Sequence, residues 1–173
     1  MRVARTVSLA MLVFASTGCA HQHHAEPTAF PDGVLVGRHS AGTVALGNAQ
    51  AATQLVNIGS LGIYGSLRAN FSEWTDAAID LLAEKLTDSG MTVTPASPRK
   101  LSLAVTDARI GYTGGGWAWK CTVTLNVEGA NGLKATFVGE RASWKYQRVC
   151  DAGISEAVAN VLRDGTVLAY LGY

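Results

Sequence analysis

The chain has 173 residues, of which 48% are hydrophobic, and its 14 Lys and Arg against 13 Asp and Glu leave a formal net charge of +1. A chain of this length supports one domain with a sizeable core. A charge balance so close to neutral gives no electrostatic reason to expect a nucleic-acid partner.

The first residues have the features of a secretory signal. Arg2 and Arg5 precede an uncharged apolar run over residues 7–15, and small residues occupy positions 16–18. The apolar run is well short of the ~20 residues that a membrane-spanning helix needs. We therefore expect residues 1–18 to be a cleaved signal peptide. Its removal leaves 12 Lys and Arg against 13 Asp and Glu, a net charge of −1.

The stretch Thr17-Gly18-Cys19-Ala20 resembles the lipobox of bacterial lipoproteins, in which the cysteine receives a diacylglyceryl group and becomes the first residue after cleavage. Ser16 departs from that family, which usually has Leu at this position. The resemblance implies a lipid on Cys19. Because Ala20 rather than Asp follows the cysteine, it also implies an anchor in the outer membrane, facing the periplasm. The alternative is an ordinary signal peptidase, which could cut after Ala20 and release a soluble periplasmic protein beginning at His21.

Residues 19–33 are rich in polar residues and proline, which favours a flexible tether. His21, His23 and His24 lie in this segment, and closely spaced imidazoles suit Cu, Ni or Zn. Mobile ligands without supporting hydrogen bonds make a weak site, so we predict a spacer without a metal ion. A cut after Ala20 would change this prediction, because a free amine, two backbone amides and the His23 imidazole suit square-planar Cu(II) or Ni(II).

Residues 34–70 are rich in glycine and contain two β-like pieces, Thr43 to Leu46 and Gly62 to Phe71. From Ser72 onward, apolar residues fall at helical spacing on one face, as a helix packed against a sheet requires. Ser72 is the expected N-cap of this helix, and Gly90 is its expected left-handed stop. The apolar stripe consists of Trp74, Ala77, Ala78, Leu81, Leu82 and Leu86.

Strand signals follow from Met91 to Thr94 and from Leu101 to Tyr112. In the longer segment the apolar alternation shifts phase after Val105, so that the apolar face continues through Ala108. The glycines at 114–116 predict a turn rather than a phosphate loop, because a strand and not a helix follows them.

The segment from Trp117 to Glu128 alternates clearly between apolar and polar residues, as in a half-buried antiparallel strand. Asn131-Gly132 then predicts a hairpin turn. The returning strand places Phe137 inward and later Trp144 inward, on the other phase. A bulge near Gly139 is expected to produce that switch.

A last helix is expected to begin near Asp151 and to end at Gly165. Cys121 lies in the preceding strand, and Cys150 lies at the entry to this helix. They are the two cysteines left once Cys19 carries a lipid. An even pair in an oxidising compartment predicts a disulfide between them.

The order of helix, short strand, three-stranded meander and closing helix indicates an α+β fold, with two main helices packed on one face of an antiparallel sheet. Residues 34–173 are expected to form this single domain. The element order over Gly62 to Leu168, together with the lipobox, resembles the YajG-type lipoprotein family. That resemblance implies an envelope lipoprotein and assigns no catalytic residue. The glycine-rich stretch before Phe71 and the expected disulfide depart from it.

No arrangement of a nucleophile with its base is evident in the sequence. His39 is adjacent to Ser40, but neighbouring side chains generally point apart, and no Gly-x-Ser-x-Gly elbow is present. Asp107 and Arg109, on one strand, predict an ordinary ion pair. We therefore expect neither a catalytic site nor a cofactor.

Tyr112, Trp117 and Trp119 bracket the glycine turn at one end of the predicted sheet, beside Lys120. Large aromatic side chains bury much area at low entropic cost, so these four residues are the candidate partner-binding site. The alternative is that both tryptophans only extend the apolar face that continues into Cys121.

These features predict a lipid-anchored, non-catalytic envelope lipoprotein that binds a protein or a cell-wall partner. Three alternatives stay open: an auxiliary lipoprotein of a lipid or solute transport machine, a soluble periplasmic protein, and an enzyme of unrecognised type. Nucleic acid is not an expected partner.

Overall fold

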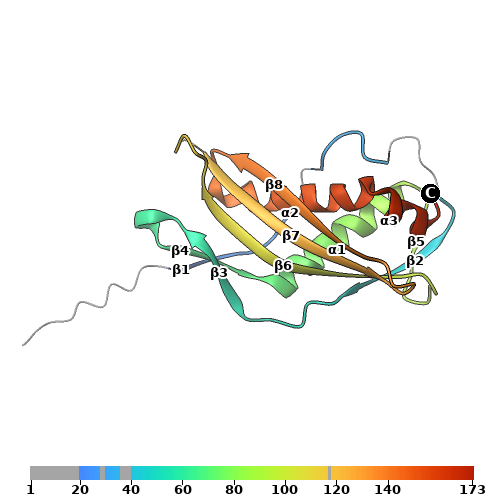
Figure 1. The fold of residues 1–173 in the computed structure, drawn as a ribbon. Coiled ribbons are helices and arrows are strands. Elements are labelled where there is room, and N and C mark those ends of the chain that lie inside the picture. Colours follow the sequence, from blue (N-terminus) through green and yellow to red (C-terminus); the bar gives the residue numbers. More distant parts are fainter. Residues whose placement is uncertain (1–19, 28–29, 36–39, 117) are drawn as a thin grey trace, which may run out of the picture.

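The structure is a computed structural model that describes residues 20–27, 30–35, 40–116 and 118–173 (Figure 1). These residues form an α+β fold, as predicted. The expected signal peptide, Cys19, His39 and Trp117 lie outside the described residues.

A five-stranded sheet in the order β5-β2-β6-β7-β8 forms the centre of the fold. β6 (Lys100–Tyr112), β7 (Trp119–Gly129) and β8 (Lys134–Ser143) make the predicted antiparallel meander. β2 (Thr43–Asn48), however, pairs parallel with both β6 and β5 (Thr92–Val93), so the sheet is mixed and not antiparallel throughout. Parallel neighbours need a long crossover connection, which the chain between β2 and β6 supplies.

A second, three-stranded sheet has the order β1-β4-β3. β3 (Leu55–Ser60) and β4 (Ser66–Asn70) form an antiparallel hairpin around the short 3-10 turn η1 (Gly62–Tyr64). β1 (Ala20–His23) lies parallel to β4. The interpretation of residues 19–33 as a flexible tether is therefore wrong for Ala20–His23, because the edge of β4 offers these residues backbone hydrogen-bonding partners.

Gly59 brings the β3–β4 hairpin close to the end of β6. A Cβ at residue 59 would lie 2.3 Å from the carbonyl oxygen of Ile110 and 2.7 Å from Cγ2 of the same residue. No side chain fits in that space, which explains why a glycine interrupts this strand. The hairpin is thus held against the last residues of β6.

Two long helices cover one face of the central sheet, as predicted (Figure 1). α1 (Phe71–Asp88) packs on β6 and β2, and α2 (Tyr146–Arg163) packs on β7 and β8; the short α3 (Gly165–Leu171) follows. The core between these layers includes the fully buried side chains of Trp74, Leu82, Leu103, Leu125, Ile154 and Leu162. No helix in the described part of the chain is long and apolar enough to cross a lipid bilayer.

The helix boundaries differ in detail from those predicted. Asn70, not Ser72, caps α1: its Oδ1 accepts hydrogen bonds from the backbone N–H groups of Ser72 (3.0 Å) and Glu73 (3.3 Å). The helix begins earlier because Phe71 is already helical and buried in the core. Gly90 follows the end of α1 with φ 93°, the left-handed conformation expected there. α2 begins at Tyr146, well before Asp151.

The phase shift predicted in β6 is confirmed, since the pairing with β7 changes register between Val105 and Asp107. The bulge predicted near Gly139 is wrong, because β8 pairs with β7 in one continuous register. Gly139 lies on the inner face, where a Cβ would be 2.0 Å from the carbonyl oxygen of Gly153 in α2. The apolar pattern of β8 is interrupted because no room is left for a side chain at that point.

Candidate partner-binding site

Tyr112 and Trp119 face each other at the end of the meander. Tyr112 is the last residue of β6, Trp119 is the first of β7, and the two are paired in register. A turn joins them, closed by hydrogen bonds from Thr113 N–H to the Ala118 carbonyl (2.8 Å) and from Gly116 N–H to the Thr113 carbonyl (2.7 Å). Two of the predicted site residues are thus brought together, whereas Trp117 lies outside the described residues.

The aromatic rings at this end are packed together, and one of them is buried while another is accessible to solvent. The centroids of Tyr112 and Trp119 are 3.9 Å apart, and Tyr146 of α2 meets Trp119 at 5.9 Å. Trp119 is only 8% exposed, whereas Tyr112 is 55% exposed. Trp119 therefore extends the apolar face toward Cys121, as the alternative interpretation held. The part of the stack that a partner can reach is Tyr112.

Lys120 does not join these rings. Successive side chains of a strand point to opposite faces, so Lys120 lies on the side of the sheet that the helices leave uncovered. Its ammonium group donates to the Glu140 carboxylate across the sheet at 3.0 Å. Of the four predicted site residues, the structure thus places Tyr112 and Trp119 together and Lys120 apart from them.

Trp144 is an accessible aromatic residue, although the apolar pattern of its strand predicts the opposite. It was expected to point inward, but it is 75% exposed. Ser143 is the residue of β8 that pairs with Trp119, so Trp144 comes directly after the paired strand and before α2 begins. We refer to Tyr112, Trp119, Trp144 and Tyr146 as the aromatic end. The apolar pattern alone does not reveal this orientation. In the continuous register of β8, Ser143 and not Trp144 is in phase with the inner face.

The predicted disulfide is confirmed, and it links the two elements that carry Trp119 and Tyr146. Cys121 of β7 is bonded to Cys150 of α2, their Cα atoms are 5.0 Å apart, and both side chains are fully buried. Cys121 shares a face of β7 with Trp119, and Cys150 lies one turn after Tyr146 in α2. The covalent bond therefore fixes the helix start that carries Tyr146 to the strand that carries Trp119.

Cations flank the aromatic residues in the sequence. Lys145 and Arg148, both exposed, follow Trp144, and the segments 112–120 and 143–150 contain no Asp or Glu. An aromatic surface with lysine and arginine beside it suits a partner that offers apolar or sugar rings together with negative charge.

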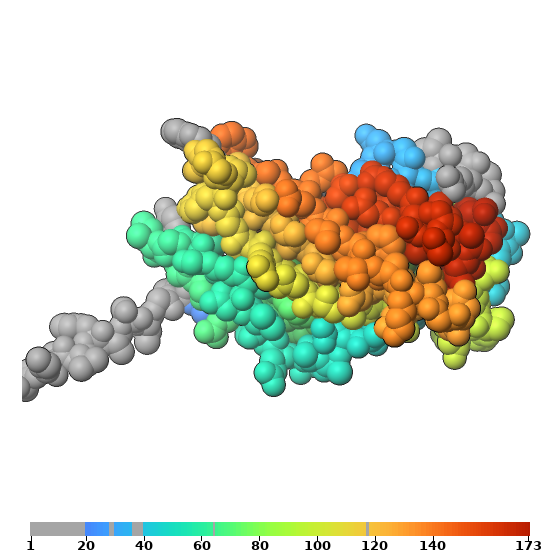
Figure 2. Space-filling view, viewed as in Figure 1, coloured from blue at the N-terminus to red at the C-terminus, as the bar shows by residue number. Residues whose placement is uncertain are grey.

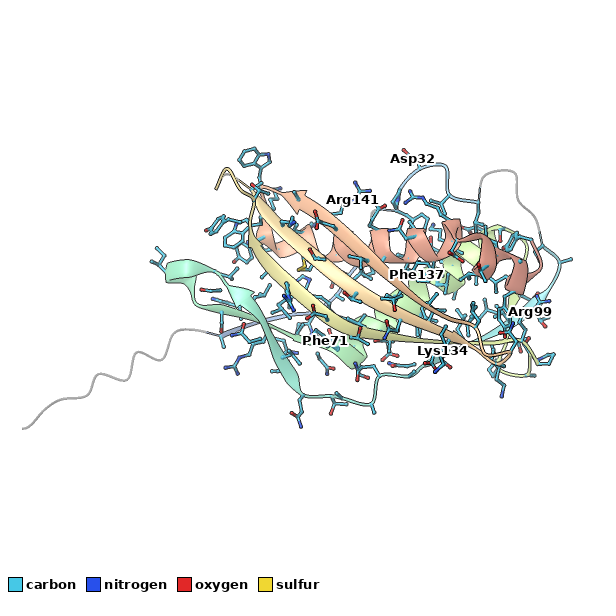
Figure 3. The ribbon with its side chains drawn as sticks, in the orientation of Figure 1. Asp32, Phe71, Arg99, Lys134, Phe137 and Arg141 are labelled. Carbon is cyan, nitrogen blue, oxygen red and sulfur yellow. A yellow bond between two sulfur atoms is a disulfide. The ribbon has the colours of Figure 1, made fainter. Side chains whose placement is uncertain are left out.

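A paired carboxylate lies further along β8 and α2. Arg141 on β8 (Figure 3) and Arg163 on α2 both donate to Glu156, Arg163 Nη1 at 2.7 Å from Oε1. Burial of the carboxylate opposes its charge, but the hydrogen bond from Arg163 and the charge of Arg141 outweigh it, so the pKa of Glu156 is lowered. This trio stabilises the contact between helix and sheet.

The residues weighed for catalysis and metal binding are engaged elsewhere. Asp107 and Arg109 form the predicted exposed ion pair at 3.0 Å. The Ser40 hydroxyl oxygen accepts from the backbone N–H of Gly42 at 3.4 Å, and the adjacent His39 lies outside the described residues. Among the described residues, no group of three or more His, Cys, Asp or Glu side chains is placed to hold a metal ion.

Two of the N-terminal histidines attach the first strand to the helices. His23 Nε2 lies 2.9 Å from Oδ1 of Asp151 in α2, and the indole N–H of Trp74 donates to the His23 carbonyl at 3.1 Å. His24 Nδ1 lies 2.8 Å from Oε1 of Glu73 in α1. The same Asp151 oxygen accepts from the backbone N–H of Glu26 at 3.1 Å. The segment that follows Cys19 is therefore fixed to both long helices.

No protein-family model matches this chain, and no curated protein matches it.

Proposed function

We propose that this protein is a lipid-anchored, non-catalytic lipoprotein of the bacterial envelope that captures a protein or cell-wall partner with its aromatic end. The observation that carries the proposal is the accessible ring of Tyr112, whose centroid lies 3.9 Å from that of the buried Trp119, at the same end of the sheet as the exposed Trp144. Exposed aromatic side chains on a rigid base bind at low entropic cost, since they have few torsions to restrict.

The envelope location is supported by the signal-like N-terminus and by the disulfide. A buried cysteine pair that is oxidised suits a compartment outside the cytoplasm. Acylation at Cys19 keeps β1 whole, whereas a cut after Ala20 would remove the first residue of that strand. The lipobox-like sequence, with Ala20 after the cysteine, favours the outer membrane, and the resemblance to the YajG-type family agrees with this proposal.

A binding role, rather than a catalytic one, is supported by the chemistry of the aromatic end. Its described segments offer rings, hydroxyl groups and the cations Lys145 and Arg148, but neither a histidine nor a carboxylate. General acid–base catalysis usually needs one of those groups within reach of the substrate.

The anchor is tested with Cys19→Ala. Because the thiol of Cys19 is the proposed acylation site, this change should move the protein from the membrane to the periplasmic fraction, or stop its processing, while the domain still folds. The mass of the N-terminal peptide of the wild-type protein reports the lipid directly. A wild-type protein that begins at His21 without lipid would show that the soluble alternative is correct.

The partner is tested by placing a photo-crosslinking amino acid at residue 144 in intact cells, with residue 138 as the control. Val138 is also an exposed apolar residue, at 49%, but it lies in the middle of β8. A defined product at 144 and not at 138 supports capture by the aromatic end, and its identity separates a protein from peptidoglycan. A product with a subunit of a transport complex would favour the auxiliary role, and equal labelling at both positions would refute the site.

A further inference from the structure

The tip of the β3–β4 hairpin presents one large apolar side chain to solvent. Ile63 in η1 is 95% exposed, more than any other large apolar side chain that the structure describes. The tip itself is well ordered by its own contacts: Leu61 is buried, and its N–H donates to the Gly65 carbonyl at 2.7 Å. Gly62 and Gly65 supply the positive φ values, 66° and 100°, that the turn requires. The conformation of the turn therefore fixes Ile63 in a position exposed to solvent.

The N-terminal end of the described chain lies beside this tip. β1 runs parallel to β4 with Ala20 opposite Ser66, and Ser66 is the first residue after the turn that carries Ile63. Cys19 is the residue directly before Ala20. One residue spans at most about 3.6 Å, so an acyl chain on Cys19 starts close to the hairpin tip.

Contacts at His23, the last residue of β1, attach this strand to the domain. The ion pair of His23 with Asp151 and the hydrogen bond from Trp74 to the His23 carbonyl hold β1 to the two long helices. The side chains of His23 and Asp151 are only 10% and 13% exposed. A lipid on Cys19 is thus attached to a rigid body, and the orientation of that body at a membrane is restricted.

We propose that Ile63 and the hairpin tip insert into the surface of the lipid bilayer, as a second membrane contact beside the acyl anchor. This inference rests on the proposed acylation of Cys19. An apolar side chain gains by leaving water for the acyl region, and the anchor already brings it to the surface.

The charges near the tip are compatible with a bilayer. Neither the stretch 57–68 nor the stretch 20–25 contains an Asp or Glu, and Arg68 of β4 is exposed. Phosphate groups of the lipid therefore meet no carboxylate from these two stretches, and Arg68 can pair with them. The tip and the turn between β6 and β7 lie at the same end of the molecule (Figure 2), because Gly59 packs on Ile110. A partner of the aromatic end would consequently be met near the membrane.

The contact is tested with the acylated mature protein, which begins at Cys19, in phospholipid vesicles whose acyl chains carry bromine, which quenches nearby tryptophan fluorescence. The variants are Ile63→Trp and Leu55→Trp, each compared with the wild-type protein and its four tryptophans. Leu55 is a matched control: it is 44% exposed in the same hairpin but pairs with Asn70 at the other end of β4. That places it roughly 17 Å along the strand from the tip.

The added indole at residue 63 should lose most of its emission in brominated vesicles, whereas the one at residue 55 should keep it. Equal quenching of the two variants, in protein whose N-terminal peptide carries the lipid, would overturn the membrane contact and leave the proposed anchor intact. An N-terminal peptide without lipid would overturn both. Thermal melting of each variant confirms that the fold is retained, as expected for two exposed positions.

Discussion

The backbone of Gly139 in β8 lies directly against the backbone of Gly153 in α2. A Cβ at residue 139 would stand 2.0 Å from the Gly153 carbonyl oxygen and 2.3 Å from the backbone nitrogen of Ala157. The helix therefore approaches the sheet more closely than any side chain would allow. Along α2, Gly153 lies between Cys150 of the disulfide and Glu156 of the ion pairs, so three different interactions hold α2 to the meander.

Gly139→Ala should destabilise the protein more than an ordinary overpacked core position, which costs about 1–3 kcal/mol. The reason is that the new methyl group meets backbone atoms of α2, which can move only if the helix moves. Urea unfolding measures the change. Gly165→Ala is the control, because a Cβ at residue 165 meets nothing within 4 Å; equal stabilities for the two variants would contradict the close contact.

Trp119→Ala and Trp144→Ala should differ sharply in stability. Trp119 is 8% exposed between two tyrosine rings, so its truncation should cost about 3–5 kcal/mol, as for other buried aromatics. Trp144 is 75% exposed, and its loss should change the free energy of unfolding by less than about 0.5 kcal/mol. Thermal and urea melts of both variants decide this. A large loss from Trp144→Ala would mean that this residue supports the fold and is not available to a partner.

Removing the disulfide with the double change Cys121→Ala/Cys150→Ala should lower the free energy of unfolding by about 2–4 kcal/mol, since the bond closes a loop between residues 29 positions apart. The same loss should follow reduction of the wild-type protein. Mass mapping without reductant should recover the two cysteines in one linked peptide pair. Recovery of both as free thiols from the envelope would be inconsistent with the structure.

Glu156→Gln should reduce stability by about 1 kcal/mol near neutral pH, because it removes the charge that Arg141 and Arg163 both contact. The pKa of Glu156 is lowered in the folded protein, so its stabilisation is fully present above the ordinary value of 4.5. It is lost as the pH falls through the folded value. The difference between wild type and variant should accordingly shrink in acid.

Urea unfolding at pH 7 and at pH 3 tests that dependence. Glu128→Gln is a suitable control, since its carboxylate is 57% exposed beside Lys134 and should contribute little at either pH. A difference for Glu156→Gln that stays constant into acid would show that the carboxylate is not stabilised as a charged group.

The sequence predicted well those features that repeat locally. The stripe through Trp74 and Leu82 defined α1, and the break in alternation after Val105 predicted the register shift of β6. The disulfide was predicted from an even number of remaining cysteines and the expected oxidising compartment. In each case the information lies within one element or in one residue type, so distant contacts are not needed to recognise it.

The sequence failed where a distant contact decides the local structure. Gly139 and Arg141 break the apolar pattern of β8, because α2 fills the first position and Glu156 binds the second. β1 carries no apolar pattern and depends on β4 and on Asp151, 128 residues after His23. Of the predicted site, Tyr112 and Trp119 lie together as expected, whereas Trp144 was placed on the wrong face because of the mistaken bulge.

The attachment of β1 has a consequence for the order in which the chain matures. In the secretion that we propose, Asp151, 128 residues after His23, would leave the secretion channel long after His23 had passed through it. Until then β1 would lack its ion pair with α2. The enzymes of the proposed processing would thus have a period, set by the length of the remaining chain, in which they could reach the N-terminal segment. If the domain folded first, β1 would already be held against α2 when the enzymes arrived. The arrangement therefore favours modification before folding.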